Sequence, residues 1–91
     1  MFTFEWDYRK AESNVQKHSV TLDEAVTVFA DPLALTFADT DHSETEDRSR
    51  TYGVSNKGRL LVVVHTERRH NVRIISARKA TRYEKSIYAQ G

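Results

Sequence analysis

The five consecutive apolar residues Leu60–Val64 constrain the fold more than any other segment. Successive side chains of a strand point to opposite faces, so this run is apolar on both faces. A strand of that kind belongs in the middle of a sheet. We therefore expect a central strand within 59–66, with neighbours over 50–55 and 72–77 that are joined to it by hairpin connections at 56–58 and 67–71.

The first forty residues predict further strands and a helix. Residues 2–6 alternate apolar and polar side chains, which indicates a short strand, and Asp7 follows as a good helix cap. We expect the first helix over 8–18. Residues 33–37 are expected to form an edge strand.

Two Thr-x-x-Glu patterns predict the starts of two more helices. Thr21 with Glu24 has the spacing of a capping box, in which the threonine hydroxyl and the glutamate carboxylate satisfy each other's backbone N–H groups. Asp31–Pro32 ends this second helix. Thr81 with Glu84 repeats the pattern and opens a terminal helix. The order of elements predicts an α+β fold, with an N-terminal helical pair and a C-terminal helix packed on a small antiparallel β-sheet.

Charge is sorted along the chain although its total is only +1. Residues 1–47 hold 3 Lys/Arg against 11 Asp/Glu, a net −8, whereas residues 48–91 hold 11 Lys/Arg against 2 Asp/Glu, a net +9. The basic residues are threaded through the predicted strands instead of forming a tail. A positive surface on an ordered scaffold is typical of proteins that bind polyanions.

Length and composition narrow the class of protein. A chain of 91 residues with 38% apolar and 30% charged residues suits one globular domain, which we expect to span 1–91. No run approaches a membrane span and the N-terminus lacks a signal-peptide pattern, so we expect a cytoplasmic protein without a membrane partner. The absence of cysteine excludes disulfides, thiolate nucleophiles and cysteine-ligated zinc.

Arginines of the basic half form the strongest functional pattern. Arg73 lies on the predicted strand 72–77 and Arg78 directly follows it, while Arg59 and Arg68 lie on the preceding hairpin. Arginine suits phosphate because its planar fork donates two parallel hydrogen bonds and stays charged. The plainer interpretation is that these side chains only solvate the sheet or pair with the acidic half. Strand parity puts Arg73 and Arg78 on opposite faces, so they need not share one site.

Other patterns are weaker. Each of the four histidines, His18, His42, His65 and His70, favours a structural role when taken alone. The acidic stretch 39–47 lacks the ligand spacing of a calcium loop, so we expect a solvated loop and no metal site. Glu46, just before Arg48, is an alternative active-site residue. Among the aromatic residues, we assign Phe4, Trp6 and Phe29 to the core, and Tyr88 stays open between packing and base stacking.

The chain resembles the BrnT family of toxins from bacterial type II toxin–antitoxin systems, which are relatives of the RelE-like ribonucleases. Each matching segment is weak, but the ordered set is specific and covers nearly the whole chain. Ser19 and Tyr8 depart from it, standing where the family often has glycine and proline. The matching residues are Phe4–Asp7, Lys10, Asn14, Lys17–His18, Glu24–Ala25, Val28–Phe29, Asp31–Pro32, Glu46, Arg48, Gly53, Gly58–Leu60, Val63–Thr66, Arg68, Arg73–Arg78, Ala80, Glu84 and Tyr88.

The resemblance implies a RelE-like toxin that cleaves RNA without a metal or other cofactor and inhibits translation and growth. It also implies neutralisation by a BrnA-type antitoxin with a ribbon-helix-helix DNA-binding part, so that operator DNA is contacted only through the antitoxin. Such cleavage needs a base for the 2′-hydroxyl, cations for the extra phosphate charge, and an acid for the leaving oxygen. The candidate catalytic residues are Lys17, His18, Glu46, Arg48 and Arg78, with base and acid unassigned, and the candidate RNA-binding residues are Arg59, Arg68, Arg73 and Tyr88.

Two functions of other classes compete with this expectation. A non-catalytic module could use the basic sheet to bind nucleic acid or a protein partner within a transcriptional autorepression complex. A purely structural domain, whose two charge halves neutralise each other, would bind RNA weakly at moderate salt.

Overall fold

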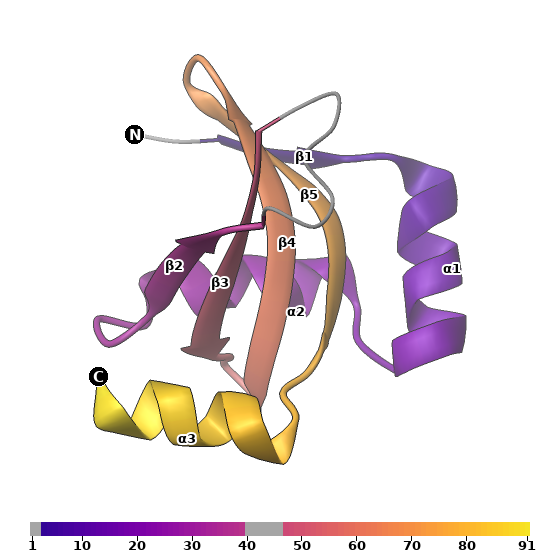
Figure 1. Cartoon of the computed structure of the whole chain (residues 1–91). Coiled ribbons are helices and arrows are strands. Elements are labelled where there is room, and N and C mark those ends of the chain that lie inside the picture. The colour runs from indigo at the N-terminus through magenta and orange to yellow at the C-terminus, as the bar shows by residue number, and fades with distance from the viewer. Residues whose placement is uncertain (1–2, 40–46) are drawn as a thin grey trace.

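The computed structural model describes residues 3–39 and 47–91. His42 and Glu46, with most of the acidic stretch, lie outside the described residues. The elements of the described chain follow one another in the order that the sequence predicts (Figure 1). They are β1 (Thr3–Trp6), α1 (Tyr8–His18), α2 (Leu22–Thr27), the 3₁₀ helix η1 (Val28–Ala30), β2 (Leu35–Ala38), β3 (Arg48–Val54), β4 (Leu60–Arg68), β5 (Asn71–Lys79) and α3 (Arg82–Gln90).

The strands form one sheet in the order β1-β5-β4-β3-β2, so the apolar run of residues 60–64 does lie on the central strand. The pairs β2–β3, β3–β4 and β4–β5 are antiparallel, and the last two have the hairpin connections that the sequence predicts. β1 instead runs parallel to β5, and the expectation of an entirely antiparallel sheet is therefore wrong for this pair. The alternating pattern of residues 2–6 predicts a strand but carries no information on its direction, because no tight turn connects it to its partner.

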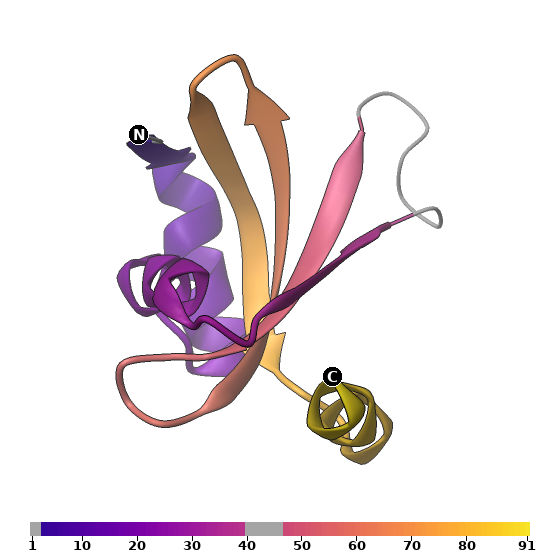
Figure 2. The ribbon, with the colours of Figure 1, turned by 90° about the vertical axis from the view of Figure 1, so that its left-hand side faces the viewer.

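The helices cover the two faces of the sheet unequally. α1 and α2 lie on one side and α3 lies on the other (Figure 2). Leu61 and Val63 of β4 belong to the buried core beneath the N-terminal helices, together with Ile74 of β5. Val62 points to the opposite face and is also fully buried. The α+β class is thus confirmed, and the central strand is apolar on both faces for the reason that the sequence indicates.

A β-bulge in β5 changes which side chains share a face. The register shifts between Val64 and His65 of β4, so β5 carries one extra residue there. Arg73 consequently pairs with Thr66, and Arg78 pairs with Val62. These two β4 positions are four residues apart and lie on the same face. The parity argument that separated Arg73 from Arg78 is therefore wrong, because it assumed an uninterrupted strand.

The helix caps agree with the sequence in two cases and differ in one. Asp7 caps α1 by accepting hydrogen bonds from the backbone N–H groups of Arg9 and Lys10. Thr81 and Glu84 form the complete capping box of α3. Before α2, Thr21 accepts from the backbone N–H of Glu24, but the carboxylate of Glu24 is bound by other residues and the predicted box is half formed.

The turn between α1 and α2 requires a left-handed residue. Ser19 has φ 57° and ψ 34°, a left-handed conformation that glycine adopts without strain. Its backbone N–H donates to the carbonyl of Val15, which closes the end of α1. Among the described residues, no helix is long and apolar enough to span a bilayer.

Candidate active site

The described strands place five arginines on the face of the sheet opposite α1 and α2, and we call them the arginine face: Arg48, Arg50, Arg68, Arg73 and Arg78. Arg48 and Arg73 flank Thr66 of the central strand, because both pair with it. Two strand spacings therefore separate their backbones, about 10 Å. Arg50 follows Arg48 by two residues on β3 and points to the same side.

A cleft of about 300 Å³ opens over the middle of this face. A smaller hollow of about 200 Å³ adjoins it beside α1, which stands along the β5 edge of the sheet (Figure 1). The two share His18, Ile75 and Ser76, and together we call them the basic cleft. Ile75 and Ser76 are the residues of the bulge, which turns both toward this side. The remaining lining residues are Asp39, Arg48, Arg50, Val64 and Arg78 of the larger part, and Lys10, Ser13, Asn14 and Lys17 of the smaller.

The charge of the basic cleft is strongly positive. Among the described lining residues, Asp39 is the one carboxylate, and it is 3% exposed. Its Oδ1 lies 3.9 Å from Nε of Arg50, and its backbone N–H donates to the carbonyl of Arg48. Asp39 thus ties the end of β2 to the arginines of β3. Excess cations in a concave, partly dry site attract a phosphate group more strongly than the same cations on an open surface.

Arg78 is held in place by an ion pair with Glu84 of α3. Its Nη1 and Nη2 donate to the two carboxylate oxygens at 2.7 and 2.8 Å, and Nη1 also donates to the carbonyl of Lys79 at 3.3 Å. Arg78 lowers the pKa of Glu84 from 4.5 to about 2. A guanidinium has five N–H groups, so the Nε–H and one Nη2–H stay available for a ligand. The pair therefore orients Arg78 without using all its donors.

Asn14 positions the end of α1, and with it His18, against the sheet. Its side-chain Nδ2 donates to the carbonyls of Val20 and Ala77, both at 2.8 Å. Its Oδ1 accepts from the backbone N–H of Ala77 at 3.0 Å. β1 pairs with β5 only as far as Ile74, so Asn14 satisfies backbone groups that the parallel strand leaves open. The sequence gives no local signal of this role, because the partners are 6 and 63 residues away.

None of the four predicted RNA-binding residues lines the basic cleft as the structure describes it, and two of them bind carboxylates elsewhere in the fold. Arg59 donates from Nε to Glu24 at 2.9 Å and forms a salt bridge with it, which lowers the pKa of that buried carboxyl. Tyr88 donates its hydroxyl hydrogen to Asp31 at 2.6 Å. Both side chains therefore join distant parts of the fold.

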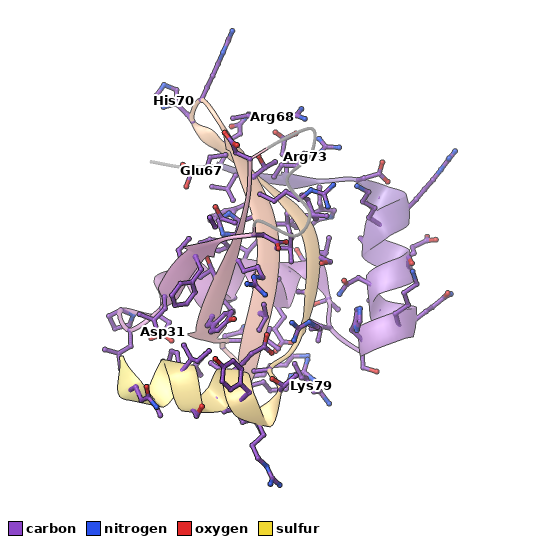
Figure 3. All side chains as sticks on the ribbon, viewed as in Figure 1. Asp31, Glu67, Arg68, His70, Arg73 and Lys79 are labelled. Atoms are coloured by element: carbon purple, nitrogen blue, oxygen red, sulfur yellow. The ribbon has the colours of Figure 1, made fainter. Side chains whose placement is uncertain are left out.

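The other two predicted RNA-binding residues lie at the hairpin end of the sheet. Arg68 and Arg73 are close to that end, opposite the end that holds Lys79 (Figure 3). Arg68 is exposed, and Nη1 of Arg73 lies 3.4 Å from the carboxylate of Glu5 on β1. They extend the positive surface beyond the basic cleft.

Of the described histidines, only His18 lines the basic cleft. His65 is 2% exposed, and its Nε2 is 2.7 Å from the hydroxyl of Thr51. The ring of Phe29 packs edge-on against it, with centroids 5.0 Å apart. Burial lowers the pKa of His65, so the neutral ring is favoured. His70 is exposed in the β4–β5 turn (Figure 3).

Sequence reasoning missed Arg50, Asp39, Lys10 and Ser76. Arg50 had a usable signal: it follows Arg48 by two, and residues two apart on a strand share a face. The sequence predicts a strand that begins at Arg50, so Arg48 falls outside it and the pattern does not place the two arginines side by side on one face. Asp39 was assigned to a solvated loop because it begins the acidic stretch. Within residues 3–39 and 47–91, no three His, Asp or Glu side chains gather as a metal site would require.

Comparisons with known proteins agree on one family. The family model described as "Ribonuclease toxin, BrnT, of type II toxin-antitoxin system" matches residues 6–84. The crystal structure of the Brucella abortus ribonuclease toxin BrnT superimposes with a TM-score of 0.69, covering 90% of this chain and 100% of that one. The two sequences are 19% identical, so the superposition shows a shared fold. No curated protein sequence matches this chain.

Proposed function

This chain belongs to the BrnT family of ribonuclease toxins of type II toxin–antitoxin systems, and we propose that its basic cleft cleaves RNA without a metal ion. One observation carries the proposal. The β5 bulge and the end of α1 bring Arg48, Arg50, Arg78 and His18 around a single cleft of about 300 Å³. Cations that can bind a phosphate thus surround a side chain that can transfer a proton.

The proposed chemistry divides between the sheet and α1. Deprotonating the 2′-hydroxyl lets it attack the adjacent phosphorus, and the extra negative charge of that phosphate then needs fixed cations. Arg48, Arg50 and Arg78 supply them. His18 and Lys17, at the end of α1, are the proposed proton-transfer groups, since histidine suits general acid–base catalysis near neutral pH. Glu46 remains a candidate from the sequence, and it lies outside the described residues.

The geometry favours revised roles for two predicted RNA-binding residues. Arg59 and Tyr88 are committed to Glu24 and Asp31, and we assign them to holding the fold together. Arg68 and Arg73 are proposed to bind the RNA backbone on the side of the cleaved bond that faces the β4–β5 hairpin. The RNA substrate then lies along β4 and β5, from the hairpin end toward α3.

The proposed protein partner is a BrnA-type antitoxin with a ribbon-helix-helix DNA-binding part. An active ribonuclease harms its own cell unless its site is covered, and free toxin is expected to inhibit translation and growth. We expect an acidic or amphipathic segment of the antitoxin to cover the basic cleft and to fold on contact. Operator DNA would then be bound through the antitoxin, in a complex that represses its own operon.

Cleavage of a fluorescent single-stranded RNA in EDTA tests the activity. The wild-type chain should cleave the RNA but not an all-deoxy oligonucleotide, because the 2′-hydroxyl is the proposed nucleophile. Arg50→Gln should slow cleavage on the order of 100-fold, the usual effect of removing one group that stabilises transition-state charge. Arg9→Gln is the matched control, since it removes an exposed arginine of α1 that lies outside the cleft. Cleavage that requires added metal, or that survives Arg50→Gln, contradicts the proposal.

One observation favours the non-catalytic alternative. Arg78 and Arg50 each have a carboxylate partner within the chain, so part of the charge of the cleft is already neutralised. A binding module of this kind would bind RNA or an acidic protein segment and never cleave RNA, free or on translating ribosomes. Under that alternative, Arg50→Gln would weaken binding while no variant showed nuclease activity.

A further inference from the structure

A second hollow opens beside the basic cleft, and its walls are largely aromatic and apolar. Its volume is about 480 Å³, which is within the range of small-ligand sites. It lies between the edge of the sheet and α3, and it shares Arg50 with the basic cleft. We call it the aromatic hollow, and its lining residues are Phe37, Ala38, Arg50, Tyr52, Thr81, Tyr83, Glu84 and Ile87.

Two of these aromatic side chains are exposed without a packing reason. Tyr83 is 74% exposed and Phe37 is 41% exposed. Phe37 contacts the buried Tyr52, with ring centroids 5.3 Å apart, so one ring face is supported while the side chain stays open to solvent. One supported ring and one exposed tyrosine beside the same hollow provide surfaces on which a planar group can stack.

We propose that the aromatic hollow binds the nucleobase next to the phosphate that the basic cleft holds. The inference rests on the proposed ribonuclease function and adds a base-binding subsite to it. Arg50 connects the two parts: it pairs with Phe37 across β2 and β3, and it precedes Tyr52 by two residues on the same face. The anion site and the stacking surface are thus about 7 Å apart along one strand. A nucleotide needs both sites side by side, because its base and phosphate are joined through one sugar.

The charge of the hollow suits an uncharged planar ring. Its one carboxylate among the described lining residues is Glu84, and both oxygens of Glu84 are bound by Arg78. A base entering the hollow therefore meets rings, aliphatic carbon and a compensated ion pair, with Arg50 at the border to the basic cleft. Stacking of this kind tolerates any of the four bases, since each has a π face. The subsite would accordingly strengthen RNA binding more than it would select a sequence.

Binding of an uncleavable RNA tests the subsite apart from catalysis. A fluorescein-labelled single strand with 2′-O-methyl riboses lacks the proposed nucleophile, and its affinity is measured by anisotropy. Tyr83→Ala should lower the affinity about fivefold, the loss expected for one stacked base, while Tyr83→Phe should retain it. Tyr8→Ala is the matched control: Tyr8 is 77% exposed on α1 and lies outside the hollow. Tyr83 makes no side-chain hydrogen bond among the described contacts, so its removal should leave the fold intact.

Abasic substitutions identify the base itself. Removing one base at a time from the same RNA should weaken binding to the wild-type chain at one position in particular. At that position Tyr83→Ala should bind the complete and the abasic RNA equally, because the base and the ring act as one interaction.

The outcomes separate this inference from the function on which it rests. If the wild-type chain cleaves RNA while Tyr83→Ala binds as tightly and senses the abasic position equally, the subsite is refuted and the ribonuclease stands. If the wild-type chain neither binds nor cleaves RNA, both proposals fail. If Tyr83→Ala loses affinity for the purified antitoxin while its RNA affinity is unchanged, the hollow binds protein and the inference is overturned.

Discussion

Two arginine–glutamate pairs in this chain have the same chemistry and different uses. Arg59 binds Glu24 where α2 meets the β3–β4 turn, and Arg78 binds Glu84 at the edge of the basic cleft. In both, the carboxylate is buried and its pKa is lowered, chiefly by hydrogen bonds from the arginine. Only the second pair faces a concave cationic surface. The comparison teaches that the surroundings of an arginine, more than its partner, separate a structural role from a functional one.

Breaking the first pair should give the largest loss of stability. Arg59→Ala leaves Glu24, which is 3% exposed, as a buried and unpaired charge. The free energy of unfolding should fall by about 3 kcal/mol, which urea denaturation would show as a lower midpoint at unchanged slope. RNA cleavage per folded molecule should equal that of the wild-type chain. Lost cleavage in a fully folded Arg59→Ala sample would return Arg59 to the RNA-binding set.

Breaking the second pair should reduce both stability and activity. Arg78→Ala should lower the free energy of unfolding by about 2 kcal/mol, since Glu84 is 6% exposed and loses its partner. Cleavage should be lost with it. The double variant Arg78→Met with Glu84→Gln should recover stability, because it removes both charges and glutamine still serves a capping box. It should not recover cleavage, and a double variant as active as wild type would exclude Arg78 from the site.

The pH dependence of the free energy of unfolding should distinguish the contribution of the Arg78–Glu84 pair from that of the buried His65. The pKa of Glu84 is about 2 in the folded chain against an ordinary 4.5, so Glu84 binds a proton more readily in the unfolded chain. Its contribution to the free energy of unfolding is therefore present above pH 4.5 and is lost as pH falls toward 2. His65, whose folded pKa is lowered by burial, costs stability earlier, as pH falls below its ordinary 6.5.

Urea unfolding at a series of pH values measures both windows. Glu84→Gln should remove roughly 3 kcal/mol of the decline below pH 4.5. The lowered pKa values of Glu24 and Asp31 contribute further to the same decline. His65→Gln should flatten the decline that begins as pH falls below 6.5 and leave the contribution of Glu84 unchanged. Equal flattening in both windows by either variant would contradict the assignment.

The smallest expected effect concerns the turn that carries His18 toward the sheet. Ser19→Gly should stabilise the chain by up to about 1 kcal/mol, because glycine adopts the observed φ of 57° without strain. Thermal unfolding should then shift upward by a few degrees. Gly58→Ala is the control of opposite sign, since Gly58 has φ 73° in the β3–β4 turn. A lower melting temperature for Ser19→Gly would show that the serine side chain contributes there.

Local patterns in the sequence were sufficient for the elements and for the position of the central strand. α1 spans the predicted residues 8–18, directly after the predicted cap Asp7, and residues 60–64 lie in the middle of the sheet. A helix cap involves groups three residues apart, and strand alternation is a property of consecutive residues. Such signals are complete within a short window. The family resemblance, confirmed by the match over 6–84, likewise depends on the order of short segments along the chain.

Only the tertiary structure determines which charged residues lie close to one another. The bulge after Ile74 moved Arg78 onto the face of Arg73, and β1 paired in parallel with β5. Asn14 donates a hydrogen bond to Ala77, which is 63 residues away in the sequence, and Arg59 binds Glu24, which is 35 residues away. These contacts depend on strand register and on how α1 and α2 pack against the sheet. One extra residue reverses every side chain beyond it, so the composition of the cleft cannot be read from the spacing of its arginines.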